Sequence, residues 1–157
     1  MSAEVLVERF RRLLFGVSAA IFALTPLELV LAKHYDTGVK LIPFVLCALG
    51  LLAVLAAWLR PRRQTLLLLR GLMLVIIVGS LVGSVEHLSG NLEFALETHP
   101  AAPLSALLVT TLQGASPLLA PGILALAAVL GIAATHAHPA LAPGSLKRVL
   151  ALAVGSR

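Results

Sequence analysis

The stretch GSLVGSVEHLSGNLEFALETH, residues 79–99, decides the fold that this chain can adopt. It begins as the end of a long apolar run and finishes as the most polar and most acidic passage of the sequence. Such a transition is typical of the point where a membrane-spanning helix reaches water. The polar residues that follow one another there are Glu86, His87, Asn91, Glu93, Glu97 and His99.

The composition excludes an ordinary soluble domain. Hydrophobic residues make up 59% of the 157 residues and charged residues only 12%, and the mean hydropathy is +1.01. Soluble domains contain roughly 45–50% apolar and about 25% charged residues. At about 20 residues per crossing, the length suffices for four spans and short connections in a single domain. We therefore predict an all-α polytopic membrane protein, an antiparallel four-transmembrane-helix bundle.

Four apolar blocks give the predicted spans, at about residues 13–32, 41–59, 66–88 and 118–136. Ser89-Gly90 is expected to end the third helix, and Asn91 to cap a new one. Within the outer connection, 89–117, the apolar stretch 101–113 is too short to span, so we expect a re-entrant or interfacial helix. Residues 137–157 form the predicted cytoplasmic tail, which includes a short interfacial helix from Ser145. A signal peptide at the N-terminus is the competing interpretation, disfavoured because the apolar run continues past Ala23 without a cleavage region.

The distribution of basic residues predicts the orientation. All of the 12 Lys and Arg residues except Lys33 and Lys40 fall at the N-terminus, between spans two and three, in the tail, or, for Arg70, one turn inside the third span, where the side chain can reach back to the same side. By the positive-inside rule, both termini and the second connection are cytoplasmic, and the first and third connections face outward. The net charge of +5 therefore reflects membrane orientation, and we expect no nucleic-acid partner.

Small residues recur at four-residue spacing along the spans. Gly79 and Gly83 mark the third span in this way, as do Ala127 and Gly131 in the fourth. In lipid, small residues let helix backbones approach closely. They favour a compact bundle, and also association with the helices of other membrane proteins or of further copies of the chain.

The outward polar residues are the candidate site. Glu28 lies inside an apolar run, where a carboxylate is costly unless it is paired, hydrated or protonated. If the third helix continued unbroken, Glu86, Glu93 and Glu97 would share one stripe of it. The alternatives are that these groups only solvate a loop and that Glu28 only sets helix packing. Candidate ligands for a divalent cation or proton are Glu28, Glu86, His87 and Glu93, with His34, Asn91, Glu97 and His99 as further polar residues of that face.

Catalytic motifs do not occur. The sequence contains no GxSxG, HExxH, Glu-x-x-His or phosphate-binding glycine loop. The single cysteine, Cys47, excludes an internal disulfide and is expected to be a small buried apolar residue. His136 and His138 are a weak alternative metal pair, because further ligands do not accompany them. We predict no enzymatic activity and no cofactor, with a divalent cation as the one alternative.

Four segments resemble a group of uncharacterised bacterial four-span membrane proteins. They are PLELVLAKHYDTGVKLIPFVL (26–46), GNLEFALE (90–97) after Glu86-His87, GASPLLAPG (114–122) and HPAL (138–141). The resemblance implies a bacterial cytoplasmic-membrane protein with its polar positions on the outer side.

Two functional hypotheses follow, with the bilayer as the first partner of either. The first is a non-enzymatic accessory or interaction subunit of the inner membrane. The second is a cation- or proton-binding or transport element at the outer face. A lipid-modifying enzyme using Glu86 and His87 is disfavoured, because adjacent residues of a helix point about 100° apart.

Overall fold

The computed structural model describes residues 2–114, 116 and 120–142, which form helices and connections without any strand. The helices are α1 (Ala3–Leu31), α2 (Ile42–Leu59), α3 (Arg63–Thr98), α4 (Leu104–Leu112) and α5 (Gly122–Ala134). Short 3-10 turns, η1 (Val39–Leu41) and η2 (Pro139–Leu141), precede α2 and follow α5. The predicted all-α class is confirmed. The tail helix predicted from Ser145 lies outside the described residues.

Three helices are long and apolar enough to cross a membrane. They cover Ala3–Leu31, Val39–Leu59 and Arg63–Thr98, with mean hydropathies of 2.0, 2.5 and 2.4 in their most apolar windows. Helix α5 has only 13 residues, about 20 Å at 1.5 Å per residue, against about 30 Å of hydrocarbon. The fourth predicted span is therefore represented by a shorter apolar helix.

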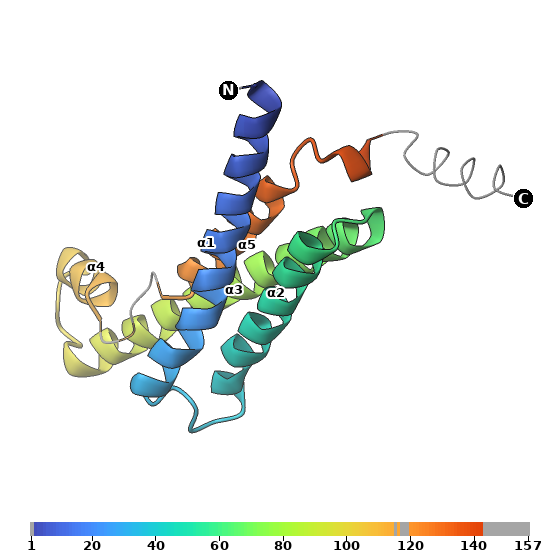
Figure 1. Cartoon of the computed structure of the whole chain (residues 1–157). Helices are drawn as coiled ribbons and strands as arrows, with labels where there is room; N and C mark the ends of the chain where they lie inside the picture. Colours follow the sequence, from blue (N-terminus) through green and yellow to red (C-terminus); the bar gives the residue numbers. More distant parts are fainter. Residues whose placement is uncertain (1, 115, 117–119, 143–157) are drawn as a thin grey trace, which may run out of the picture.

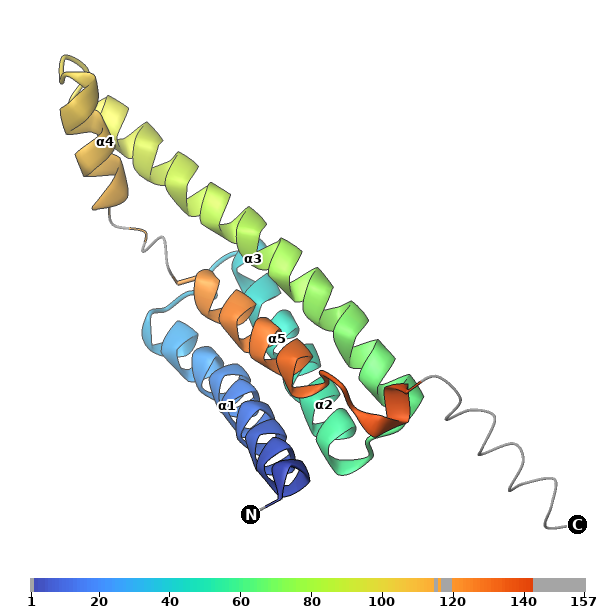
Figure 2. The ribbon, with the colours of Figure 1, turned by 90° about the horizontal axis from the view of Figure 1, so that it is seen from above.

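Helix α5 packs between α1 and α3 and runs antiparallel to both (Figure 1, Figure 2). Ser18 of α1 donates a hydrogen bond from its hydroxyl to the carbonyl of Ala127, at 2.8 Å. Ser80 of α3 likewise donates to the carbonyl of Pro121. Helix α2 packs on the same two helices, α1 and α3. The core shared by these helices includes Phe22, Val54, Met73 and Ala128.

The small residues lie at contacts between the helices of this chain. A Cβ on Gly131 would lie 3.3 Å from Ser18 Oγ, one on Gly83 3.3 Å from Pro121, and one on Gly50 only 2.7 Å from the Phe22 ring. Ala127 is also buried. These faces bring α1, α2, α3 and α5 together, and so they do not need helices of another protein to cover them.

Two arginines hold the last residues of α5. Arg11 Nε donates to the carbonyl of Ala134 at 3.1 Å. Arg70 donates from Nε to the hydroxyl oxygen of Thr135 at 2.7 Å and from a terminal nitrogen to the Thr135 carbonyl at 3.1 Å. Cations at a helix C-terminus satisfy carbonyls that lack intrahelical partners. Arg70 therefore stabilises the end of α5, besides marking the basic end of the molecule.

Helix α3 corrects the sequence-based boundary. It continues through Ser89, Gly90 and Asn91 to Thr98, ten residues beyond the predicted end at 88. A glycine inside a helix costs only about 1 kcal/mol relative to alanine, so flanking leucines, alanines and glutamates can override it. Asn91 caps no helix, because its side chain bonds elsewhere.

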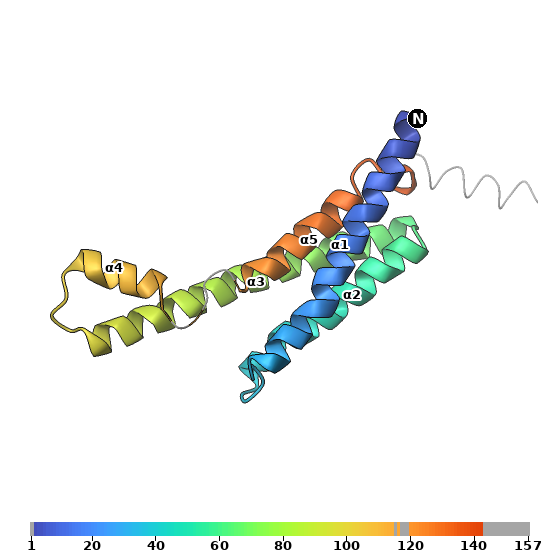
Figure 3. The ribbon, with the colours of Figure 1, turned by 60° about the vertical axis from the view of Figure 1, so that its left-hand side comes forward.

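The outer part of α3 and α4 form a helical hairpin that projects from the other helices (Figure 3). With 36 residues, α3 is about 54 Å long at 1.5 Å per residue, well beyond about 30 Å of hydrocarbon. Helix α4 folds back along it, within the predicted stretch 101–113. We call residues 86–112 the arm.

Candidate functional site

The turn after α1 brings His34 against α3. Lys33 has φ 53°, and the backbone N–H groups of Lys33 and His34 donate to the carbonyls of Val30 and Leu29, at 3.0 and 2.8 Å. This is a Schellman ending with a lysine at the left-handed position that glycine usually occupies. The conformation costs a non-glycine residue roughly 1–2 kcal/mol. The reversal places the His34 ring beside His87.

His34 and His87 are two predicted site residues whose rings lie side by side. Their ring centroids lie 6.5 Å apart at an interplanar angle of 61°. Partial burial lowers the pKa of His34, and the positive charges of Lys40 and His87 lower it further, against a smaller opposite effect of Asp36. The neutral form of His34 is therefore favoured.

Asp36 and Lys40 form an ion pair in the same connection, with Lys40 Nζ 2.7 Å from the carboxylate. The hydrogen bond from Lys40 lowers the pKa of the exposed Asp36 carboxyl. An exposed pair of this kind contributes little stability. The pair places one negative and one positive charge near His34, and these two charges shift the pKa of His34 in opposite directions.

Glu28 lies on an exposed position of α1, one turn before the helix ends. Within the described residues, no hydrogen bond or ion pair joins its carboxylate to His87, to His34 or to any other side chain. Thr25, three residues earlier, is the buried polar group at this depth and donates to the Ile21 carbonyl of its own helix at 2.8 Å.

The acidic stripe exists because α3 is unbroken. Glu86, Glu93 and Glu97 are all exposed and share one side of the arm. None of the three carboxylates forms an ion pair within the part of the chain that the structure describes. Over the same residues, no three side chains of His, Cys, Asp or Glu come close enough to hold a metal ion. Glu28, Glu86, His87 and Glu93 are therefore not gathered into one site.

Asn91 holds the arm together. Its side-chain nitrogen donates to the Ser116 carbonyl at 2.9 Å, and its side-chain oxygen accepts from the Ser116 N–H at 3.0 Å. A Cβ on Gly114 would lie 2.3 Å from the Asn91 amide carbon, so only glycine fits there. Asn91 is 4% exposed, and its amide thus forms a reciprocal pair with a backbone peptide away from water.

The remaining histidines lie apart from this region. His99 follows α3 at the tip of the arm, with Nδ1 2.9 Å from the Thr98 hydroxyl. His136 is exposed near the opposite end of the molecule, and His138 accepts the Ala140 N–H at 3.1 Å. Burial and the nearby Arg11 lower the pKa of His138. The described residues therefore give His136 and His138 no third ligand.

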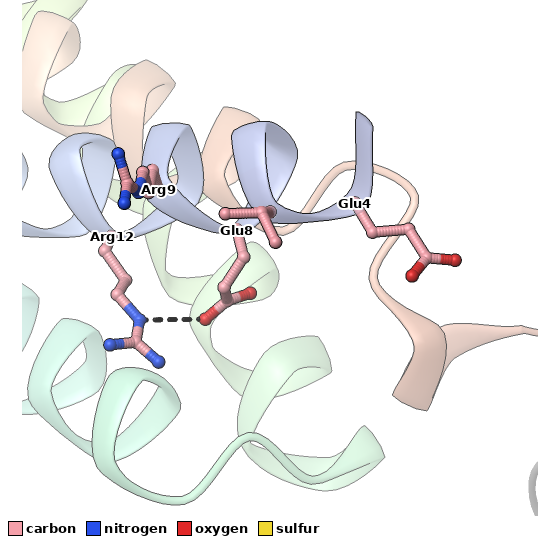
Figure 4. A pocket seen from close by; sticks show the side chains of 5 residues that line it. Glu4, Glu8, Arg9 and Arg12 are labelled. Atoms are coloured by element: carbon pink, nitrogen blue, oxygen red, sulfur yellow. Dashed lines mark hydrogen bonds and ion pairs between the residues drawn. The ribbon is translucent and has the colours of Figure 1, made fainter. Parts of the chain in front are cut away.

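The basic end carries a shallow depression along one side of α1, lined by Glu4, Val5, Glu8, Arg9 and Arg12 (Figure 4). Glu8 accepts from Arg12 at 3.0 Å and from Arg11 at 2.7 Å. All lining residues belong to one helix, so the depression is part of the helix surface. It brings together no groups from different elements.

Sequence reasoning missed the roles of Ser18, Ser80 and Thr135 as interhelical hydrogen-bonding groups. The available signal was a hydroxyl at a small-residue position of an apolar helix, since such groups bond across helices in membranes. The role of Asn91 could have been suspected from its place within a continuous helical pattern.

No protein-family model, curated protein or solved structure matches this chain. The structure itself gives the class of protein: an all-α protein that has, among the residues described, three helices long and apolar enough to cross a membrane.

Proposed function

We propose that this protein is a non-enzymatic accessory subunit of the bacterial inner membrane, and that it presents the arm to another membrane protein. The main support for the proposal is the structure of the arm. It continues a spanning helix without a break, α4 packs against that helix, and the Asn91 amide bonds to Ser116, which follows α4. A rigid projection with exposed apolar side chains is suited to contact with a partner.

In this proposal α5 is the fourth crossing, and both termini are cytoplasmic. Helix α5 lies alongside α3 from Ser80 to Arg70. The segment leading into it is fastened at Asn91 and packs Pro121 against Gly83. The arginines at the start of α1, between α2 and α3, and at Arg70 support a cytoplasmic basic end.

The test is site-specific photo-crosslinking in native membranes. A photoreactive residue at Leu92 or Leu108 is expected to give one discrete protein adduct. The control positions Leu68 and Val75, which are also exposed and lie along the span, are expected to give lipid adducts only. Identical patterns from all four positions would contradict the proposal.

A second proposal, a proton-responsive element, is supported by the contact between His34 and His87. Thermal unfolding would be followed over a pH series, and with Zn²⁺, Mn²⁺, Fe²⁺ or Cu²⁺ alone, for wild type, Glu28→Gln and His87→Ala. A ligand that binds only the folded state raises its stability. A response lost in the variants supports the second proposal, and an unchanged response in all three proteins eliminates it.

A further inference from the structure

The arm has two different long sides. On the outer part of α3, which packs against α4, the buried residues are Asn91 and Ala95. At about 100° per residue, a stripe of leucines lies on one side of these two residues, and the acidic stripe lies almost opposite them, about 120° further around the helix from the leucines. The leucines are exposed and spaced four residues apart: Leu88, Leu92 and Leu96.

Helix α4 repeats the pattern. Thr111 is buried in this helix. Around the helix axis, one side of Thr111 carries three exposed leucines spaced four residues apart: Leu104, Leu108 and Leu112. Leu104 is 73% exposed and Leu112 64%. When each helix is viewed along its own chain direction, its leucines are reached from its buried residues by turning around the helix axis in the same direction. Because the helices run antiparallel, that rotation brings both stripes to one face of the hairpin.

The face combines six leucines with uncompensated negative charge along the neighbouring side. Neither Lys nor Arg occurs between Gly71 and Leu146, and no ion pair involves Glu86, Glu93 or Glu97 within the described part of the chain. Helices that lie on lipid are rich in Lys and Arg on their polar side. The arm has the opposite charge, which disfavours a lipid surface and favours a basic protein.

We propose that the leucine face of the arm docks an amphipathic helix of a membrane-anchored partner, whose apolar side covers the leucines and whose Lys and Arg residues pair with Glu86, Glu93 and Glu97. This inference rests on the proposed function and specifies the chemistry of the partner. The leucine stripe of α3 continues the exposed residues Leu74, Leu81 and Val85 of the span. A partner helix leaving the membrane beside α3 can therefore follow one apolar surface onto the arm.

The experiment uses the full chain in nanodiscs of zwitterionic lipid, with Cys47→Ser and an environment-sensitive fluorophore at Ser105→Cys, which lies at the edge of the leucine face. The probes are two synthetic amphipathic helical peptides with the same leucine seam, one flanked by Lys and the other by Glu. We expect saturable binding of the Lys peptide only. Its affinity should fall at least tenfold in Glu93→Lys/Glu97→Lys and in Leu92→Gln/Leu108→Gln, and remain unchanged in the control Glu4→Lys.

Three results would overturn the inference. Equal binding of both peptides would show that charge does not select the partner. Quenching of the fluorophore by a lipid-borne quencher before peptide is added would place the leucine face in the bilayer. Crosslinking between two arms would make a second copy the occupant. If native-membrane crosslinking still gave a protein adduct from Leu92 and Leu108, the proposed function would stand while this inference failed.

Discussion

At the scale of single residues, Asn91 shows how one polar side chain determines the path of the chain. Its amide satisfies both the N–H and the carbonyl of Ser116, and Gly114 leaves it the necessary room. A hydrogen bond contributes about 1 kcal/mol, and a buried group left unpaired costs about 1–3 kcal/mol. The stability of the arm therefore depends on this residue.

Asn91→Ala is expected to loosen α4 from α3, because the Ser116 peptide loses both partners. We expect a loss of about 1–3 kcal/mol, measured as faster amide exchange over residues 104–114 by hydrogen–deuterium exchange. Gly114→Ala should act in the same direction. Unchanged exchange over α4 in both variants would contradict the role assigned to Asn91.

At Lys33 a substitution is expected to stabilise the protein, because glycine adopts the backbone conformation of this residue more readily than lysine does. With φ 53° at this position, Lys33→Gly is expected to raise the free energy of unfolding by about 0.5–1 kcal/mol through relief of strain. Thermal unfolding in detergent measures the change. Lys40→Gly at a position without positive φ is the control, and a destabilised Lys33→Gly would show that the turn differs from a Schellman ending.

His34 makes stability depend on pH in a defined direction. Its pKa is lowered in the folded protein, so the unfolded chain binds more protons below the ordinary value of about 6.5. Stability should therefore decrease as the pH falls below about 6.5 and level off once folded His34 is protonated. His34→Gln should reduce this slope, leaving the contribution of His138, whose pKa is also lowered. An unchanged slope of unfolding temperature against pH would contradict the account.

At the scale of elements, the main difference from the sequence-based prediction is that α3 continues without a break. The sequence around Ser89-Gly90 resembles a helix end, yet the helix continues to Thr98. Among the described residues, no heavy atom outside the adjacent turns of α3 lies within 4 Å of a Cβ placed on Gly90, so alanine fits there without a clash.

Gly90→Ala is therefore expected to stabilise the protein by about 0.5–1 kcal/mol, the difference in helix propensity between the two residues. Gly50→Ala is the contrasting variant, because its Cβ would lie 2.7 Å from the buried Phe22 ring. Overpacking of this kind costs about 1–3 kcal/mol. Both are measured by thermal unfolding under the same conditions, and destabilisation by Gly90→Ala would indicate that α3 ends at this glycine.

The sequence predicts those elements that depend on local patterns and does not predict those that depend on contacts between distant residues. The long apolar runs predict α1, α2 and the inner part of α3, because apolar length is a local property. The burial of Cys47 is confirmed as well. The end of α3 was predicted wrongly, because Asn91 and Gly114 act through a contact between residues distant in sequence. The meeting of His34 with His87 depends on the turn at Lys33, and no local pattern specifies its direction.

At the scale of the whole molecule, the helices place basic residues at one end and the arm beyond the other (Figure 2, Figure 3). The small-residue faces are covered inside the molecule. Exposed apolar side chains beyond the predicted spans lie on the arm and at the start of α1, at Val5, Leu6, Val7 and Phe10. The faces between α1, α2, α3 and α5 therefore hold the fold together, whereas the arm is the surface that we propose for recognition.

Helix α3 is one continuous helix from Arg63 to Thr98 that carries the arm beyond the other helices (Figure 3). Pulsed electron paramagnetic resonance between spin labels at Gln64→Cys and Glu97→Cys, in a Cys47→Ser background in nanodiscs, tests this continuity directly. Both positions are exposed and lie on α3. At 1.5 Å per residue, an unbroken helix predicts a narrow distance distribution near 50 Å. A distribution that is broad or clearly shorter would show that α3 ends or bends at Ser89-Gly90, and would contradict the projecting arm.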